Sequence, residues 1–147
     1  MEIKIVGLRE DLFSPYGRIL EPLGNESPEV AEQDNFDFYV TFKEFSQGWQ
    51  IGYLINVSKK LKQLERHPNT AEVFSPVTGD TLLVVSENPE DLQTIKGFKL
   101  EKSIVFYRGV WHGVISLSEK SEVLIVESPD VIDEFFQLQK TVVAPEL

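Results

Sequence analysis

The stretch Leu64-Glu65-Arg66-His67-Pro68-Asn69-Thr70-Ala71-Glu72 decides the fold predicted for this chain. Residues two apart on a β-strand face the same side of the sheet. Glu65 and His67 are therefore expected to project into the same space, while Arg66 points away from His67. If Glu72 begins the next strand, its carboxylate joins this group.

The chain has only two histidines, and the second lies on the far side of a hydrophobic strand run. It ends the stretch Tyr107-Arg108-Gly109-Val110-Trp111-His112. Histidine titrates near neutral pH and is the commonest metal ligand, so His67 and His112 together indicate a site. Both side chains are expected to lie close together, facing a polar cavity rather than filling the core.

Working outward, the periodicity is mostly that of β-strands. Between residues 49 and 57, Ile51, Tyr53, Ile55 and Val57 alternate with more polar residues, which predicts a half-buried strand. Short β-rich runs bounded by turn residues predict further strands. These candidates are residues 36–42, 81–85, 103–107 and 122–126.

Evidence for helices is limited to short segments. Residues 10–13 can form one turn before Pro15, and residues 90–94 another, with Asn88 as its cap. Residues 128–138 fit a C-terminal helix or an extended tail, and the pattern leaves both open. The prediction is a mainly β fold with one or two short helices, most simply a closed barrel or jelly roll that hides its strand edges.

Composition bounds the possible functions. With 147 residues, 41% of them hydrophobic, the chain is expected to form a single domain over residues 1–147. A net charge of −10 disfavours nucleic acids and anionic membranes as partners. The absence of cysteine excludes disulfides, thiolate metal sites and a cysteine nucleophile. No stretch approaches the roughly 20 apolar residues of a membrane span, so a cytoplasmic protein is expected.

The stretch Glu65–Glu72, followed by Gly79, resembles the first motif of the cupin family. Glu65 stands where that motif has its first histidine, whereas His67, Glu72 and Gly79 match it. The later segment from Gly97 through Tyr107 to His112 resembles the second cupin motif, with Tyr107 where proline is usual. The resemblance implies a cupin-like double-stranded β-helix, or jelly-roll barrel, whose equivalent groups hold one divalent metal.

Glu65-Arg66-His67-Pro68 and Gly109-Val110-Trp111-His112, with Phe13-Ser14-Pro15-Tyr16-Gly17-Arg18-Ile19 near the start, resemble the ureidoglycolate lyase family. That likeness covers about half of the chain. It implies a homodimeric, cupin-like enzyme that splits ureidoglycolate into glyoxylate and urea during allantoin degradation in purine metabolism. Two departures are that Glu72 stands where these enzymes more often have Gln, and that residues 35–48 lack an expected Arg-containing stretch.

The candidate site residues follow from the motifs and this resemblance. The expected catalytic residues are His67, His112 and Glu65, and the expected metal ligands are His67, Glu72 and His112. The expected substrate-binding residues are Arg66, Tyr53, Tyr107 and Trp111. Mixed nitrogen and oxygen ligands suit Ni, Zn, Mn or Fe, and a metal-free site with proton transfer by the histidines or Glu65 stays open.

The leading expectation is a carbon–nitrogen lyase acting on ureidoglycolate. The alternatives are a cupin that binds a sugar or organic acid without catalysis, and a metal-dependent isomerase or dioxygenase. In each case the partner is a small molecule, and a homodimer is expected because a small barrel rich in aromatic residues tends to cover an apolar sheet face with a partner.

Overall fold

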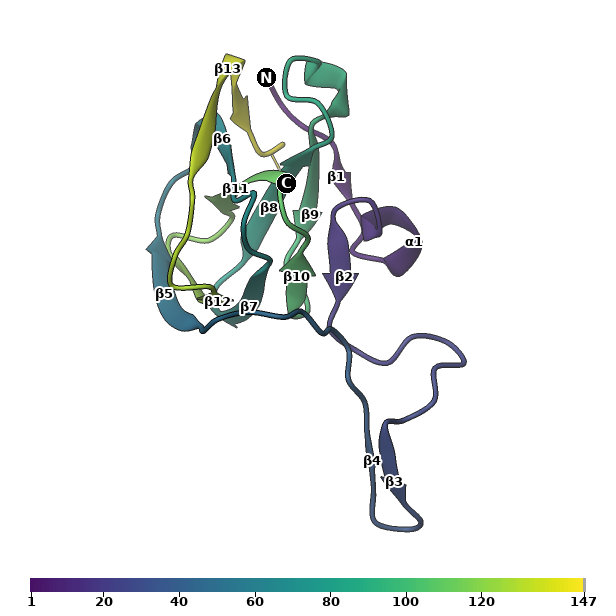
Figure 1. Cartoon of the computed structure of the whole chain (residues 1–147). Helices are drawn as coiled ribbons and strands as arrows, with labels where there is room; N and C mark the ends of the chain where they lie inside the picture. The colour runs from purple at the N-terminus through teal and green to yellow at the C-terminus, as the bar shows by residue number, and fades with distance from the viewer. Residues whose placement is uncertain (147) are drawn as a thin grey trace.

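The structure is a computed structural model that describes residues 1–146. Its elements are nearly all strands (Figure 1). In chain order they are β1 (Ile5–Val6), α1 (Glu10–Phe13), β2 (Gly17–Ile19), β3 (Val30–Glu32), β4 (Phe36–Phe38), β5 (Gln50–Asn56), β6 (Lys60–Arg66), β7 (Glu72–Thr78), β8 (Thr81–Ser86), η1 (Leu92–Thr94), β9 (Lys96–Lys99), β10 (Ile104–Phe106), β11 (Trp111–Ser116), β12 (Ser121–Glu127) and β13 (Glu134–Val143).

Two sheets carry the fold. One has six strands in the order β1-β9-β8-β11-β6-β13, and the other has five in the order β2-β10-β7-β12-β5. Strands consecutive in the sequence, such as β5 and β6 or β7 and β8, fall in different sheets, so the chain crosses repeatedly between the two layers. This arrangement confirms the predicted cupin-like jelly-roll fold, mainly β with one short α-helix and one 3₁₀ turn.

The main core lies between the two sheets. Every residue of β8 is buried, because its alternate side chains enter two apolar clusters. Leu83 and Val85 join the inner cluster with Phe74, Phe98 and Phe106. Leu82 and Val84 point to the outer face of the six-stranded sheet.

That outer face is covered by the chain ends. Ile3 precedes β1, and Leu138 and Val142 lie on β13; all three pack against the outward side chains of the six-stranded sheet. The C-terminal segment is therefore a ten-residue strand, which settles the choice between helix and extended tail. Among the described residues, no helix is long and apolar enough to cross a membrane.

A two-stranded hairpin projects away from the barrel. Strands β3 and β4 pair only with each other, and Figure 1 shows them extending below the two main sheets. We call residues 29–38 the arm. The predicted strand at residues 36–42 is shorter than expected, because β4 ends at Phe38 and residues 39–49 run back to β5 as an irregular link.

Candidate active site

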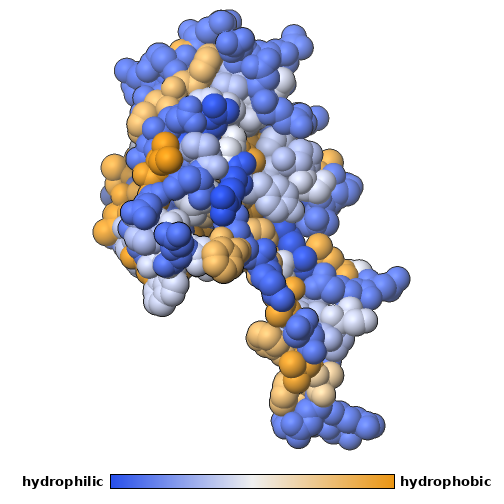
Figure 2. All heavy atoms as spheres, in the orientation of Figure 1, coloured by the Kyte–Doolittle hydropathy of each residue, from blue (hydrophilic) through white to orange (hydrophobic). Residues whose placement is uncertain are grey.

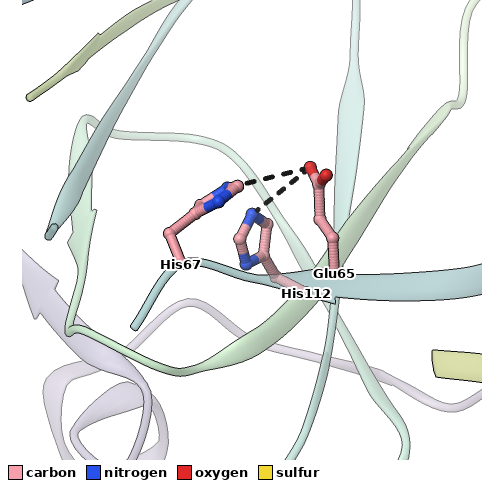
Figure 3. A group of neighbouring side chains, drawn as sticks. All are labelled: Glu65, His67 and His112. Carbon is pink, nitrogen blue, oxygen red and sulfur yellow. Dashed lines mark ion pairs between the residues drawn. The ribbon is translucent and has the colours of Figure 1, made fainter. Parts of the chain in front are cut away.

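Four ionisable side chains converge at one end of the space between the sheets. Glu65 lies near the end of β6, and His67 follows that strand directly. His112 lies on β11 opposite Glu65 in the strand register, and Glu72 is the first residue of β7 in the other sheet. Figure 3 shows Glu65, His67 and His112 pointing toward one another. The expected proximity of the two histidines is confirmed, since their ring centroids are 5.2 Å apart.

The contact atoms are the two Nε2 atoms and one oxygen from each carboxylate. Glu72 Oε1 lies 2.9 Å from His112 Nε2 and 3.5 Å from His67 Nε2. Glu65 Oε1 lies 3.8 Å from His112 Nε2 and 3.9 Å from His67 Nε2. We call Glu65, His67, Glu72 and His112 the cluster.

The other nitrogen of each ring faces an acceptor outside the cluster. His112 Nδ1 is 2.9 Å from the carbonyl oxygen of Val110, a hydrogen bond in which Nδ1–H donates. His67 Nδ1 is 2.9 Å from Asp133 Oδ1, although the N–H is not well aligned for a hydrogen bond. An acceptor at Nδ1 favours the tautomer whose Nε2 lone pair is free, and this arrangement is usual around histidines that bind metals.

Four atoms of the cluster are buried without a hydrogen-bond partner among the described residues. His67 Nδ1 lies beside Asp133, whereas His67 Nε2, His112 Nε2 and Glu72 Oε1 face one another. Buried polar atoms are normally satisfied, so this group requires protons or a cation between its members. Divalent metals bind such atoms at about 2.0–2.2 Å, which places neighbouring ligand atoms roughly 3–3.5 Å apart. The donor set therefore fits a divalent metal.

The charges of the cluster depend on one another. Burial acts to lower the pKa of His67, but the nearby carboxylates of Glu72, Glu65 and Glu127 outweigh it and raise that pKa to about 9. Burial acts to raise the pKa of Glu72, but the adjacent imidazoles of His112 and His67 hold it well below its usual range. Burial and the adjacent Glu72 raise the pKa of Glu127 to about 8.

A pocket of about 250 Å³ opens beside the cluster between β5, β6 and β11. Glu65 and His112 line it, so both can reach a small molecule placed there. Amide and hydroxyl groups surround them, and no Lys or Arg is among the lining residues. The other lining residues are Asn56, Ser58, Leu61, Gln63, Leu64, Gly113 and Val114.

The four expected substrate-binding residues lie outside this pocket. The Arg66 guanidinium stacks 4.6 Å from the ring centroid of Trp111, and both border a separate hollow of about 310 Å³. Strand alternation places them on the outer face of the six-stranded sheet, away from Glu65 and His112. Tyr53 is exposed on β5, and Tyr107 is exposed beside Phe42. The structure does not bring these four residues to the cluster.

His112 also belongs to the core, contrary to the expectation that it faces only a polar cavity. Its ring is 1% exposed and stacks on Phe106, with centroids 4.7 Å apart. Phe74 packs against the same ring edge-on at 5.9 Å. The reason is that β11 runs through the middle of its sheet, so its inward side chains meet the aromatic residues between the sheets.

Two acidic residues of the site were missed from the sequence. Glu127 lies opposite Glu72 in the register of β12 and β7. The strand predicted over residues 122–126 ends one residue before it. Asp133 reaches His67 from the irregular segment before β13. The turn of that segment is held by Asn69, whose side chain contacts the backbone of Asp130 and Ile132. Only the alternation of β12 could have indicated Glu127, and no local signal indicated Asp133.

Comparison with known proteins gives one consistent family. The family model described as ureidoglycolate lyase matches residues 1–147. The ureidoglycolate lyase of Brucella anthropi is 25% identical over 146 residues, covering 88% of this chain and 86% of the relative. The ureidoglycolate lyase of Escherichia coli SMS-3-5 is 25% identical over 133 residues, covering 76% of this chain and 78% of the relative.

Among solved structures, Bacillus subtilis oxalate decarboxylase is similar at 17% identity and a TM-score of 0.43, over 61% of this chain and 24% of that chain. Because the family model spans the full length, this chain belongs to the ureidoglycolate lyase family.

Proposed function

We propose that this protein cleaves ureidoglycolate into glyoxylate and urea at the cluster. Family membership supports this reaction class. The observation that carries the proposal is the convergence of two unpartnered, buried Nε2 atoms and two carboxylates beside a pocket of suitable size.

The reaction needs one proton to move and one bond to break. The carbon next to the substrate carboxylate bears both a hydroxyl group and a urea nitrogen. When a base takes the hydroxyl proton, the oxygen's electron pair forms the C=O bond of glyoxylate, and the C–N bond breaks. The departing nitrogen takes up a proton and leaves as urea, so no water and no redox partner is consumed.

Glu65 is the best placed residue for this proton transfer. Its side chain is 37% exposed and lines the pocket, whereas those of His67, Glu72 and His112 are almost fully buried. A carboxylate between the hydroxyl oxygen and the urea nitrogen can accept the proton from one and return it to the other. We therefore assign Glu65 as the base and then the acid.

The buried members of the cluster would hold the positive charge that the substrate needs. Ureidoglycolate is an anion, the protein has a net charge of −10, and no Lys or Arg lines the pocket. His67 and His112 would hold a divalent metal together with a carboxylate, either Glu65, whose ligand atom lies within 4.8 Å of both histidines, or Glu72, which lies 2.9 Å and 3.5 Å from the two Nε2 atoms. Such an ion would bind the substrate's oxygens and lower the pKa of its hydroxyl group. Asn56 and Gln63 line the pocket, and their side-chain amides would bind the urea group by hydrogen bonds.

The test is the rate of glyoxylate release from ureidoglycolate, measured with wild-type protein and with Glu65→Gln. The variant keeps the shape of the side chain but loses the base, so the rate should fall by about a hundredfold or more. Glu101→Gln is the matched control, because Glu101 is exposed in the turn after β9 and should keep the wild-type rate.

Three results would count against the assignment. A Glu65→Gln protein with the wild-type rate excludes Glu65 as the base. Wild-type protein that binds ureidoglycolate but releases no glyoxylate, with or without added divalent metal, is a non-catalytic binding cupin. Wild-type protein that neither binds nor cleaves it acts on another substrate.

A further inference from the structure

A second hollow lies at the end of the barrel where β6 and β8 end and β11 begins. Its volume is about 310 Å³, at the lower end of the range for small-molecule sites. It shares no lining residue with the pocket beside the cluster. The hollow is therefore a separate candidate for binding a small ligand.

The lining of this hollow is not part of the exposed apolar surface. None of its residues is among the large apolar side chains that are exposed in the described chain. Those side chains include several on the arm and on β5, and Figure 2 shows apolar surface along the arm. The hollow therefore suits a polar small molecule rather than an apolar protein surface.

Arg66 presents a guanidinium group to the hollow. Its central carbon lies 4.6 Å from the ring centroid of Trp111, and this stacking covers one face of the group but leaves its edge, where the N–H donors point. Among residues 1–146 its side chain makes one hydrogen bond, from Nη2 to Glu134 at 3.4 Å, whereas a guanidinium has five N–H donors. Its Nε is buried without a partner. Arg66 therefore retains donors for a carboxylate, which can bind a guanidinium through two parallel hydrogen bonds.

The hollow also holds one acidic side chain. Among the described lining residues, Glu87 is the only acid and Arg66 is the only base. Glu87 is exposed in the turn after β8. Tyr16 lines the hollow too, and burial together with the Glu87 carboxylate raises the pKa of its hydroxyl group. That hydroxyl is therefore neutral and lies near Glu87, and the two groups together can bind an ammonium group.

The walls of the hollow are fixed by hydrogen bonds to other parts of the chain. The N–H of Gly109 donates to the carbonyl oxygen of His67 at 3.0 Å, and the carbonyl oxygen of Val110 accepts from His112. The hydroxyl of Ser86 accepts a hydrogen bond from the backbone of the next turn. Because these groups are already in place, a ligand would lose little free energy in ordering them.

We propose that this hollow binds a zwitterionic α-amino acid with a small apolar side chain. Arg66 would bind the carboxylate of the ligand, and Glu87 with Tyr16 would bind its ammonium group. Pro15 and Val110 would contact its side chain. This site is independent of the cluster and of the reaction proposed there.

The balance of charge favours a zwitterion over a simple anion or cation. The described lining holds one positive and one negative side chain, in a protein of net charge −10. An anion without an ammonium group would meet Arg66 but also the repulsion of Glu87 and of the whole protein. A cation without a carboxylate would leave the donors of Arg66 unpaired. A zwitterion provides a partner for both side chains.

The test compares L-valine with its two halves: isovalerate, which lacks the ammonium group, and isobutylamine, which lacks the carboxylate. Each is titrated to millimolar concentration into ¹⁵N-labelled protein, with a chelator present so that no metal ion at the cluster can bind the amino acid. L-Valine should shift the backbone amide signals of Glu87, Gly109 and Val110, which line the hollow. Its dissociation constant should be at least about tenfold lower than that of either half.

Two variants test the two ends of the site. Arg66→Gln removes the partner of the carboxylate and Glu87→Gln removes that of the ammonium group, so each should weaken L-valine binding by about tenfold or more. Arg9→Gln and Glu101→Gln are the matched controls, because both residues are exposed and neither lines the hollow. Both control proteins should bind L-valine with the wild-type affinity.

Several results would overturn the proposal. L-Valine that shifts no amide signals, or only signals away from the hollow, excludes the site. Isovalerate or isobutylamine that binds as tightly as L-valine excludes recognition of a zwitterion. A folded Arg66→Gln or Glu87→Gln protein with the wild-type affinity excludes the assigned partners. The ligand series needs no variant, so it decides the proposal even where a substituted protein fails to fold.

Discussion

At the scale of single residues, the site depends on what lies behind each histidine. The carbonyl of Val110 fixes the ring of His112, and Asp133 lies beside Nδ1 of His67. Both Nε2 atoms therefore face Glu72 and Glu65 rather than solvent. The positions of the two histidines and Glu72 could be predicted from motif spacing. Asp133 could not, since it is more than sixty residues from His67 in the sequence and is placed by a loop.

The pKa values predict how stability changes with pH in metal-free protein. The pKa of His67 is raised from 6.5 to about 9, so its contribution is complete below pH 6.5 and is lost as pH rises through 9. The pKa of Glu127 is raised from 4.5 to about 8, so its contribution is also lost with rising pH, between 4.5 and 8. The pKa of Glu72 is lowered, so its contribution to stability is complete above pH 4.5 and is lost as the pH falls below that value.

Thermal unfolding measured with a chelator present should therefore show a melting temperature that falls between pH 6.5 and 9. For a chain of this size, 1 kcal/mol corresponds to about 2–4 °C. In the Glu127→Gln variant this side chain cannot ionise. The melting temperature of the variant should therefore fall less steeply with pH below pH 8 than that of the wild-type protein. A melting temperature that stays constant or rises over this interval would show that the cluster is not charged as described.

At the scale of elements, the regular strands were predictable and the connections were not. Residues 81–85 and 122–126 were predicted as strands and became β8 and β12, each extended slightly. Their alternating or continuous apolar pattern reflects burial in the two-sheet core. The apolar pattern of the C-terminal residues fitted a helix and a strand equally well. The segment forms an edge strand because it pairs with β6, and a sequence pattern does not show which strands pair. The exposure of β5 was unpredictable, since alternation reveals an apolar side but not what covers it.

The hairpin between β7 and β8 offers a test at this scale. Gly79 has a φ of 68°, and a Cβ there would lie 2.3 Å from the carbonyl oxygen of Lys120. Gly79→Ala should therefore lower the free energy of unfolding by at least about 2 kcal/mol, from the left-handed conformation and the clash together. Gly24→Ala separates the two causes, because Gly24 also has positive φ but has open space around it. Denaturant unfolding should show a loss of only about 1 kcal/mol for Gly24→Ala. Equal losses would rule out a steric role for Gly79.

At the scale of the whole molecule, the cluster joins the two layers of the barrel. His112 lies in the six-stranded sheet and His67 directly follows its strand β6, whereas Glu72 and Glu127 lie in the five-stranded sheet. An ion or proton shared among them would link the two sheets. Under the proposed function it would also place positive charge beside the pocket of a protein with net charge −10, where an anionic substrate needs it.

Both Nε2 atoms belong to one site, and nitrogen NMR of the imidazole rings tests this shared site most directly. With only two histidines in tag-free protein, each ring gives an assignable set of signals. Adding one equivalent of Zn²⁺ to ¹⁵N-histidine-labelled protein should shift both Nε2 signals together, while both Nδ1 atoms remain protonated. A response at one ring only, or at neither, would contradict the account.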